Sequence, residues 1–244
     1  MNTPERLLGK AAIEAAFSAF PTEIIHTQNL KRSRQYLEQR KGSLLVYMNH
    51  FHRLDTMVAG SVIKDFLTPI GNNVYIFVAQ QYVDENRTEN KKFVSFVKLS
   101  QQLYGFNLLP VVQDKPEELT RYPNWRKIAR VTFDRAEEAI NTPGNVICFA
   151  PEGTRSQTGE LGEGKRGIEM VMKRANKDFL IQPLVLIPAK IRPLVTRTRV
   201  VSPESFTYSE LVSEQRENPD ITITTLAMQK LARELPLALR GTYV

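Results

Sequence analysis

The chain has 244 residues, 42% of them hydrophobic and 24% charged, so it can form a core without disulfides or a metal. Its single cysteine, Cys148, excludes a disulfide framework within the chain, and its apolar neighbours favour a buried side chain over a nucleophile. The formal charge of +7 favours anionic partners, which include nucleic acid, phosphorylated substrates and anionic lipid headgroups.

The sequence predicts two helices before residue 43. Apolar residues at helical spacing predict the first over residues 4–19, and Pro21 ends it. The second, over residues 28–41, has a basic face that is either an ordinary solvated surface or an electrostatic anchor at a lipid interface. No apolar stretch reaches the roughly 18 residues that span a membrane, and the charged N-terminus is unlike a secretory signal. We therefore expect a cytoplasmic protein, soluble or peripheral at the inner face of the membrane.

From residue 43 onwards, short apolar runs alternate with helical stretches. The predicted strands cover residues 43–48, 73–79, 106–112, 145–150 and 179–191, with the last broken or divided at Pro183. The predicted helices cover residues 56–67, 91–103, 124–140, 167–176 and 222–239. This alternation indicates an α/β fold with a central, mostly parallel or mixed sheet covered by helices. We expect residues 1–42 to be an N-terminal helical segment and residues 43–244 to form one domain.

The loop after the first of these strands, residues 49–55, has the residue types of an acid–base site. His50 and Asp55 would lie about 140° apart on one regular helix, so they can meet only if His50 precedes the helix that Asp55 begins. The carboxylate would then orient the imidazole and leave its other ring nitrogen free as a general base. The alternative is that Asp55 only caps the helix and His50 is an ordinary loop histidine.

A second loop, residues 150–167, follows the strand predicted to end near residue 150. It contains five glycines and three cations, Arg155, Lys165 and Arg166, but no P-loop pattern. Gly153 would let the backbone approach a ligand closely, and the Arg155 guanidinium can fork onto a phosphate. A mobile surface loop is the alternative, although functional groups of such sheets gather at the carboxyl ends of the strands.

Together the two loops resemble the motifs of the glycerolipid acyltransferase family, whose bacterial members include lysophosphatidic acid acyltransferases. The family's first motif is Asn-His, four residues, Asp, and it matches residues 49–55. Its third motif, Phe-Pro-Glu-Gly-Thr-Arg-Ser, matches residues 149–156 with one inserted alanine. Residues 181–191 resemble a fourth, proline-containing block. The resemblance covers about residues 43–195, and the two motifs in this order are far more specific than either one alone.

The resemblance implies transfer of a fatty acyl group from a thioester, on coenzyme A or acyl carrier protein, to a lysophospholipid hydroxyl in phospholipid synthesis. The acceptor that it favours is 1-acylglycerol 3-phosphate, with glycerol 3-phosphate or another lysolipid as the alternative. It implies that His50 removes the hydroxyl proton while Asp55 holds the imidazole, without a metal or another cofactor. Gly153, Thr154 and Arg155 would grip the acceptor phosphate.

The same resemblance gives Glu152 the task of organising the second loop. One departure concerns the second motif of the family, which places an arginine after a strand to help hold phosphate. The corresponding stretch here, residues 104–115, offers Gln113, Asp114 and Lys115 instead. Lys115 would substitute as a point charge without the fork.

Two other functions stay open. His50, His52 and Asp55 resemble the start of a metal-hydrolase site, but the acid comes one position late and no further histidine follows. A non-catalytic lipid-binding module would suit the basic helix and the missing arginine. Aromatic residues interleaved with basic ones are sparse, so we expect no nucleic-acid partner. The expected partners are the acyl thioester, the lysophospholipid and an anionic membrane surface.

Overall fold

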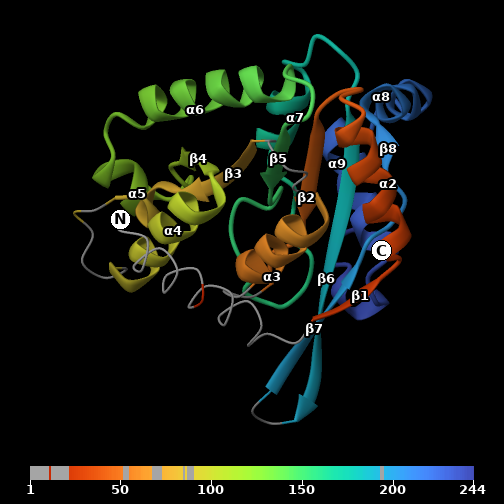
Figure 1. Cartoon of the computed structure of the whole chain (residues 1–244), viewed down its shortest axis with the longest axis horizontal. Helices are drawn as coiled ribbons and strands as arrows, with labels where there is room; N and C mark the ends of the chain where they lie inside the picture. Colours follow the sequence, from red (N-terminus) through yellow and green to blue (C-terminus); the bar gives the residue numbers. More distant parts are fainter. Residues whose placement is uncertain are drawn as a thin grey trace.

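The computed structural model of the chain describes residues 11, 22–51, 55–67, 73–84, 86, 91–192 and 195–244 (Figure 1). Most of the helix predicted over residues 4–19 lies outside these residues, as does His52. Within the described part of the chain, no helix combines the length and the apolar character needed to cross a membrane.

The described strands form one sheet in the order β1-β7-β6-β2-β5-β3-β4, and β8 pairs with β6 beside this path. The strands are β1 (Thr22–Ile25), β2 (Leu44–Met48), β3 (Val74–Ala79), β4 (Phe106–Val111), β5 (Val146–Phe149), β6 (Leu180–Arg192), β7 (Val195–Val201) and β8 (Phe206–Thr207). Among these strands the antiparallel pairs are β6–β7 and β6–β8, and every other pair is parallel. The predicted mixed, mostly parallel sheet is thus confirmed.

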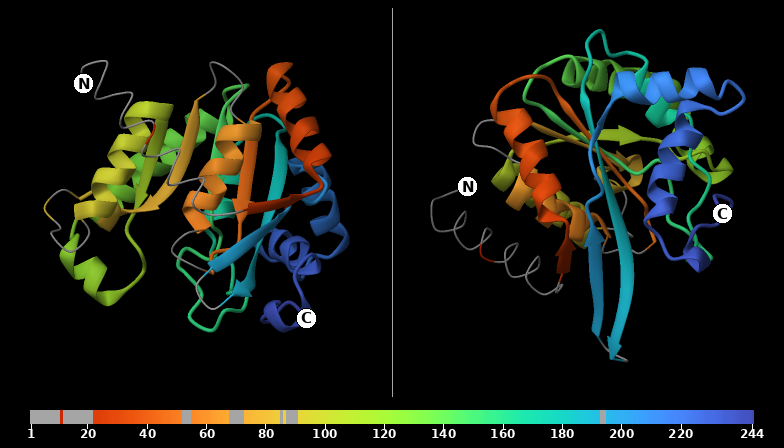
Figure 2. Two further views of the ribbon diagram at one scale, coloured as in Figure 1. Left: turned by 60° about the horizontal axis from the view of Figure 1, so that its bottom comes forward. Right: turned by 90° about the vertical axis from the view of Figure 1, so that its right-hand side faces the viewer.

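Helices cover both faces of this sheet (Figure 2). The helices are α2 (Thr27–Glu38), α3 (Asp55–Val62), α4 (Lys91–Tyr104), α5 (Pro116–Arg121), α6 (Trp125–Ile140), α7 (Gly167–Met172), α8 (Tyr208–Glu217) and α9 (Ile223–Arg233), with the turns η1 (Ile63–Leu67), η2 (Gln80–Tyr82) and η4 (Leu237–Leu239). The side chains of β2 show that a buried cluster lies on each face of the sheet, because successive side chains of a strand point to opposite faces. Leu45 and Tyr47 join a buried cluster with α6, α7 and α9. Leu44, Val46 and Met48 join a second cluster with α2 and α3.

Strand β1 differs from the prediction, since the sequence analysis expected only helix in residues 1–42. Its β-branched residues Thr22, Ile24 and Ile25 suit a strand, but four residues are too few to show a periodic pattern. The strand runs parallel to β7, with Ile25 opposite Val201. The helix that follows it, α2, buries leucines in the same cluster as β2, so this described part of the segment packs on the sheet.

Strand β6 also differs, because it continues through Pro183 instead of breaking there. On the edge away from β2, it pairs with β8 at Leu180 and Ile181 and with β7 from Val185 onwards. Pro183 falls in the gap between these two partners, where a missing N–H is tolerated. The sequence analysis also did not predict β7, β8, α5 and α8.

Candidate active site

The two predicted loops begin side by side at one edge of the sheet. Strands β2 and β5 are parallel neighbours, with Tyr47 opposite Phe149, so residues 49–55 and 150–166 leave the sheet at adjacent carboxyl ends. This is the edge at which ligands bind in open α/β sheets.

Asn49 fixes the chain at the point where it leaves β2. Its side-chain amide donates to the carbonyl oxygen of Leu186 and its oxygen accepts from the Leu186 N–H, both at 2.8 Å. The side chain is fully buried, so both hydrogen bonds are shielded from water. The position of the next residue, His50, is therefore set by a clamp between β2 and β6.

His50 and Asp55 meet in the way that the sequence analysis required. His50 lies in the loop, Asp55 is the first residue of α3, and their Nδ1 and Oδ2 atoms are 3.4 Å apart. The same Oδ2 accepts a hydrogen bond from the Phe51 N–H at 2.5 Å, so Asp55 also orders the turn. The separation from the imidazole is at the long end for a hydrogen bond, as is common in active sites without substrate. With Nδ1 facing the carboxylate, Nε2 is the ring nitrogen left to accept a proton.

Glu152 links the second loop to the first. Its Oε1 accepts from the backbone N–H of His50 at 2.7 Å, and its Oε2 accepts from the N–H of Gly162 at 2.8 Å. The residue is 2% exposed. Burial raises the pKa of Glu152 to about 7, the two N–H donors oppose that rise, and the nearby charge of Asp55 adds to it. Gly162 is required here, because a Cβ at that position would lie 2.9 Å from Oε2.

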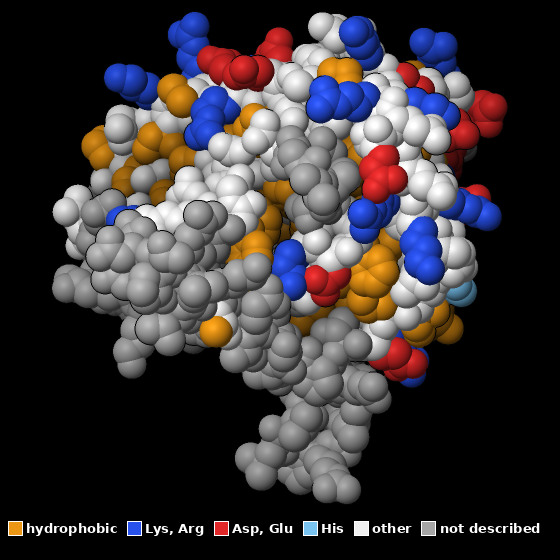
Figure 3. All heavy atoms as spheres, in the orientation of Figure 1, with side chains coloured by type: hydrophobic (Ala, Val, Ile, Leu, Met, Phe, Trp, Pro, Cys, Tyr) orange, Lys and Arg blue, Asp and Glu red, His pale blue; other side chains and the backbone are white. Residues whose placement is uncertain are grey.

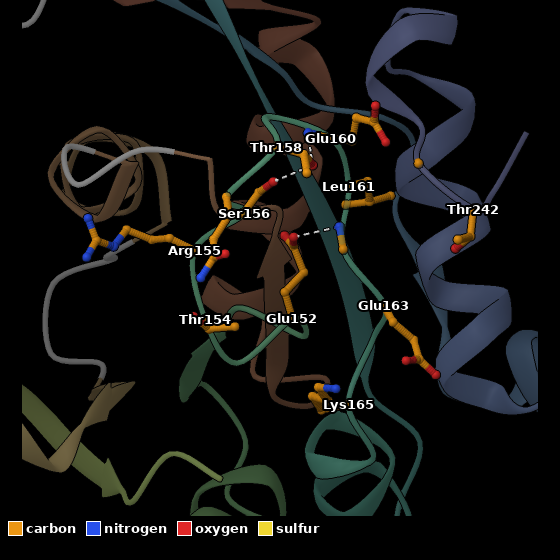
Figure 4. A pocket seen from close by; sticks show the side chains of 13 residues that line it. Glu152, Thr154, Arg155, Ser156, Thr158, Glu160, Leu161, Glu163, Lys165 and Thr242 are labelled. Atoms are coloured by element: carbon orange, nitrogen blue, oxygen red, sulfur yellow. Dashed lines mark hydrogen bonds between the residues drawn. The ribbon is translucent and has the colours of Figure 1, made fainter. Parts of the chain in front are cut away.

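The second loop surrounds a cavity of about 290 Å³. Figure 4 shows Glu152 between the two limbs of the loop, with Ser156 on one limb and Glu163 on the other. The lining residues are Glu152, Thr154, Arg155, Ser156, Gln157, Thr158, Glu160, Leu161, Gly162, Glu163, Lys165, Gly241 and Thr242. His50 is not part of this lining, but the Ser156 N–H donates to its carbonyl oxygen at 2.9 Å. Ser156, which lines the cavity, is therefore in direct contact with the His50 backbone.

The candidate phosphate ligands lie at the surface of this loop. Gly153 and Thr154 are exposed, and Arg155 is half-buried on the cavity wall. Gly153 has a φ of +66°, a backbone conformation that favours glycine, and its carbonyl oxygen accepts from the Gln113 side chain at 2.9 Å. Lys115 precedes α5 in the loop after β4 and does not line the cavity. Gln113, rather than Lys115, is therefore the residue of that loop that reaches the second loop.

The segment that follows α9 also contributes to the site, although no sequence pattern predicted it. Gly241 and Thr242 line the cavity, and the Gly164 N–H donates to the Tyr243 hydroxyl at 3.0 Å. No local pattern could have indicated this, because the two partners are 79 residues apart.

No group of three or more His, Cys, Asp or Glu side chains is placed to hold a metal within the described residues. The metal-site alternative depended on His52, which lies outside them.

Comparison with known proteins identifies part of the chain. Residues 106–187 match a family model described as Acyltransferase, and this range contains the second loop. Among solved structures, the chain is similar to the 1-acyl-sn-glycerophosphate (LPA) acyltransferase PlsC from Thermotoga maritima, with 15% identity and a TM-score of 0.43 over 87% of this chain and 77% of that one. The comparison with curated proteins returned no match. Residues 106–187 are therefore similar to the acyltransferase family, in agreement with the resemblance of residues 149–156, while residues 49–55 lie outside the match.

Proposed function

We propose that this protein transfers a fatty acyl group from a thioester to the hydroxyl of a lysophospholipid, with 1-acylglycerol 3-phosphate as the acceptor. One observation carries the proposal: Glu152, in the segment that matches the acyltransferase family, hydrogen-bonds the backbone of His50, whose ring faces Asp55. A base and its orienting carboxylate thus adjoin the loop that the family match includes.

The geometry supports direct transfer without a covalent enzyme intermediate. His50 Nε2 accepts the proton of the acceptor hydroxyl as the hydroxyl oxygen attacks the thioester carbonyl carbon. Collapse of the tetrahedral intermediate breaks the carbon–sulfur bond, and the thiolate takes the proton back from the imidazolium. Asp55 stabilises the positive ring between these two steps. A positioned base of this kind contributes about 100- to 10,000-fold to the rate.

The cations of the second loop support an anionic acceptor, and the cavity lining contains three acids beside them, Glu152, Glu160 and Glu163. Arg155 and Lys165 line the cavity, and a guanidinium or ammonium group binds phosphate through charge-assisted hydrogen bonds. On the face seen in Figure 3, basic and acidic side chains are interspersed, so the net charge of +7 is not gathered there into one patch. We therefore assign acceptor recognition to this loop, and to the overall charge only a general attraction to the anionic inner face of a membrane.

Thiol release from long-chain acyl-coenzyme A or acyl-acyl carrier protein tests the proposal, with lysophosphatidate or glycerol 3-phosphate as acceptor. We expect acceptor-dependent release that falls at least about 100-fold in His50→Asn. His26→Asn is the matched control, because His26 lies at the start of α2 with a φ of 62° that asparagine tolerates.

The outcomes separate the alternatives. Absence of release with every donor and acceptor would overturn acyl transfer, and binding to anionic vesicles would then favour the lipid-binding module. Release that is equal in His50→Asn and wild type would leave acyl transfer in place and remove His50 from it. A preference for glycerol 3-phosphate over lysophosphatidate would change the acceptor alone.

A further inference from the structure

We propose that Gly241 and Thr242, within the segment of residues 237–243, form one wall of the site for the acceptor headgroup, and that Tyr243 is a positioning residue for the loop that carries Glu152. This inference rests on the proposed function and adds to it a segment outside the part of the chain that matches the family.

Two hydrogen bonds attach this segment to the second loop. The Leu161 N–H donates to the carbonyl oxygen of Leu239 at 2.8 Å, and the Gly164 N–H donates to the Tyr243 hydroxyl at 3.0 Å. The ring of Tyr243 packs against the buried cluster that β2 forms with α6, α7 and α9, so its hydroxyl is held at a fixed place. The loop residues between Leu161 and Gly164 are therefore bound at both ends.

Close packing adds to this attachment. Gly241 has a φ of +59°, and a Cβ there would overlap the carbonyl oxygen of Leu161. Gly164, whose N–H contacts Tyr243, also packs closely against α9, because a Cβ at Gly164 would lie 2.6 Å from the Met228 side chain. The C-terminal segment and α9 thus hold the outer limb of the loop from two directions.

This limb is connected to His50 through Glu152. Gly162, between the two attached residues, donates to Oε2 of Glu152, whose Oε1 binds the N–H of His50. Movement of the C-terminal segment would therefore change the cavity wall first. It would reach the N–H of His50 through this carboxylate.

The chemistry of the cavity identifies what it holds. Leu161 is the one apolar side chain in its lining, and the other lining residues are polar, charged or glycine. Its charged groups are two cations and three acids, which together suit a polar headgroup with phosphate and hydroxyl groups rather than an acyl chain. Gly241 and Thr242 line the cavity, and Thr242 lies on the side of the loop opposite Arg155, whose guanidinium points away from Glu152 (Figure 4).

Tyr243→Phe tests the positioning role, because it removes the hydroxyl and keeps the ring. We expect the dissociation constant for a short-chain lysophosphatidate, measured by calorimetry, and the acceptor KM to rise roughly 5-fold. The donor KM and kcat should stay within about 2-fold. Tyr208→Phe is the matched control, since Tyr208 is another half-buried tyrosine, stacked on Phe179 away from the loop.

Gly241→Ala tests the wall itself and should weaken acceptor binding more than Tyr243→Phe does. Its control is Gly105→Ala, because Gly105 has a similar φ of +68° with open space around it. Both alanine variants carry the backbone strain of a positive φ, which thermal unfolding measures, but only Gly241→Ala also overlaps the Leu161 carbonyl. Loss of acceptor binding in Gly241→Ala but not in Gly105→Ala supports the assignment of Gly241 to the wall of the acceptor site.

Amide hydrogen exchange in residues 161–164 gives a measurement that does not depend on catalysis. Faster exchange in Tyr243→Phe and Gly241→Ala, together with weaker acceptor binding, supports the inference even if the wild type proves inactive in acyl transfer. Unchanged acceptor binding in both variants would overturn it, and so would a fall in kcat at constant acceptor binding. If the wild type is active in acyl transfer but binds the acceptor no more tightly than Tyr243→Phe and Gly241→Ala do, the inference is wrong and the proposed function still holds.

Discussion

The two loops of the site are held by contacts of very different range along the chain. In the first loop, Asp55 binds Phe51 and His50 across four and five residues. In the second, Glu152 binds His50 across 102 residues, and Gly164 binds Tyr243 across 79. The contact between His50 and Asp55 therefore lies within one short stretch, although the His50 backbone is also held by Glu152 and by the neighbouring Asn49–Leu186 clamp, whereas the shape of the acceptor side depends on distant elements throughout.

This difference separates the two loops by function. The His50–Asp55 pair spans only the loop between β2 and α3, and its remaining supports, Leu186 and Glu152, hold the backbone at His50. A cavity held by remote partners can change with those partners, which are the loop after β4 and the C-terminal segment. We therefore expect changes in the first loop to lower kcat and changes around the second to alter acceptor binding.

The largest effect is expected from Asp55→Asn, which tests the first loop. The amide can still accept from the Phe51 N–H but no longer balances a protonated His50. We expect kcat to fall about 100- to 1,000-fold, with thermal unfolding close to that of the wild type. Asp65→Asn, an exposed acid one element later, is the control and should leave kcat unchanged. A decrease smaller than about 3-fold in Asp55→Asn would contradict the role of this pair.

Glu152→Gln tests the link between the loops. Glutamine has one oxygen for two N–H donors, so one donor must face the amide nitrogen. We expect kcat/KM to fall about 10-fold, because one buried N–H loses its acceptor. Glu138→Gln, an exposed change on α6, should leave kcat/KM unchanged.

The pH dependence of stability in Glu152→Gln tests whether the pKa of Glu152 is raised. The pKa of Glu152 is raised from 4.5 to about 7, so between these values the folded protein holds a proton that the unfolded chain releases. Through this residue, the free energy of unfolding of the wild type should fall by on the order of 2 kcal/mol as the pH rises through that range. Glutamine does not titrate, so urea unfolding should show a flatter pH dependence in Glu152→Gln. Parallel curves would show that burial does not raise this pKa.

The smallest effect is expected from Lys115→Met, in the loop between β4 and α5. Lys115 does not line the cavity, so its charge would act on the acceptor only at long range. We expect the acceptor KM to rise about 2-fold at low salt, with kcat unchanged and with less effect at high salt. Lys115→Arg should behave as the wild type, and Lys127→Met on α6 serves as the control. A much larger increase would indicate direct contact with the phosphate.

Much of the fold could be predicted from local patterns, and the exceptions have physical causes. Strands β2, β3, β4 and β5 and helix α6 were predicted, since each is a continuous apolar run or a long amphipathic repeat. Strand β1 was missed because it is only four residues long. The break expected at Pro183 was wrong because the partner of β6 changes at that point, which depends on the position of β7 and β8.

By itself, the sequence determined the α/β alternation, the placement of His50 and Asp55 around the start of a helix, and the glycine-rich loop with Arg155. Each of these follows from spacing over a few residues. Only the tertiary structure decided that Asn49 is clamped to Leu186, that Glu152 holds the His50 backbone, and that Tyr243 closes the far side of the loop. These contacts join residues 79 to 137 positions apart, so they exist only once the sheet order brings their elements together.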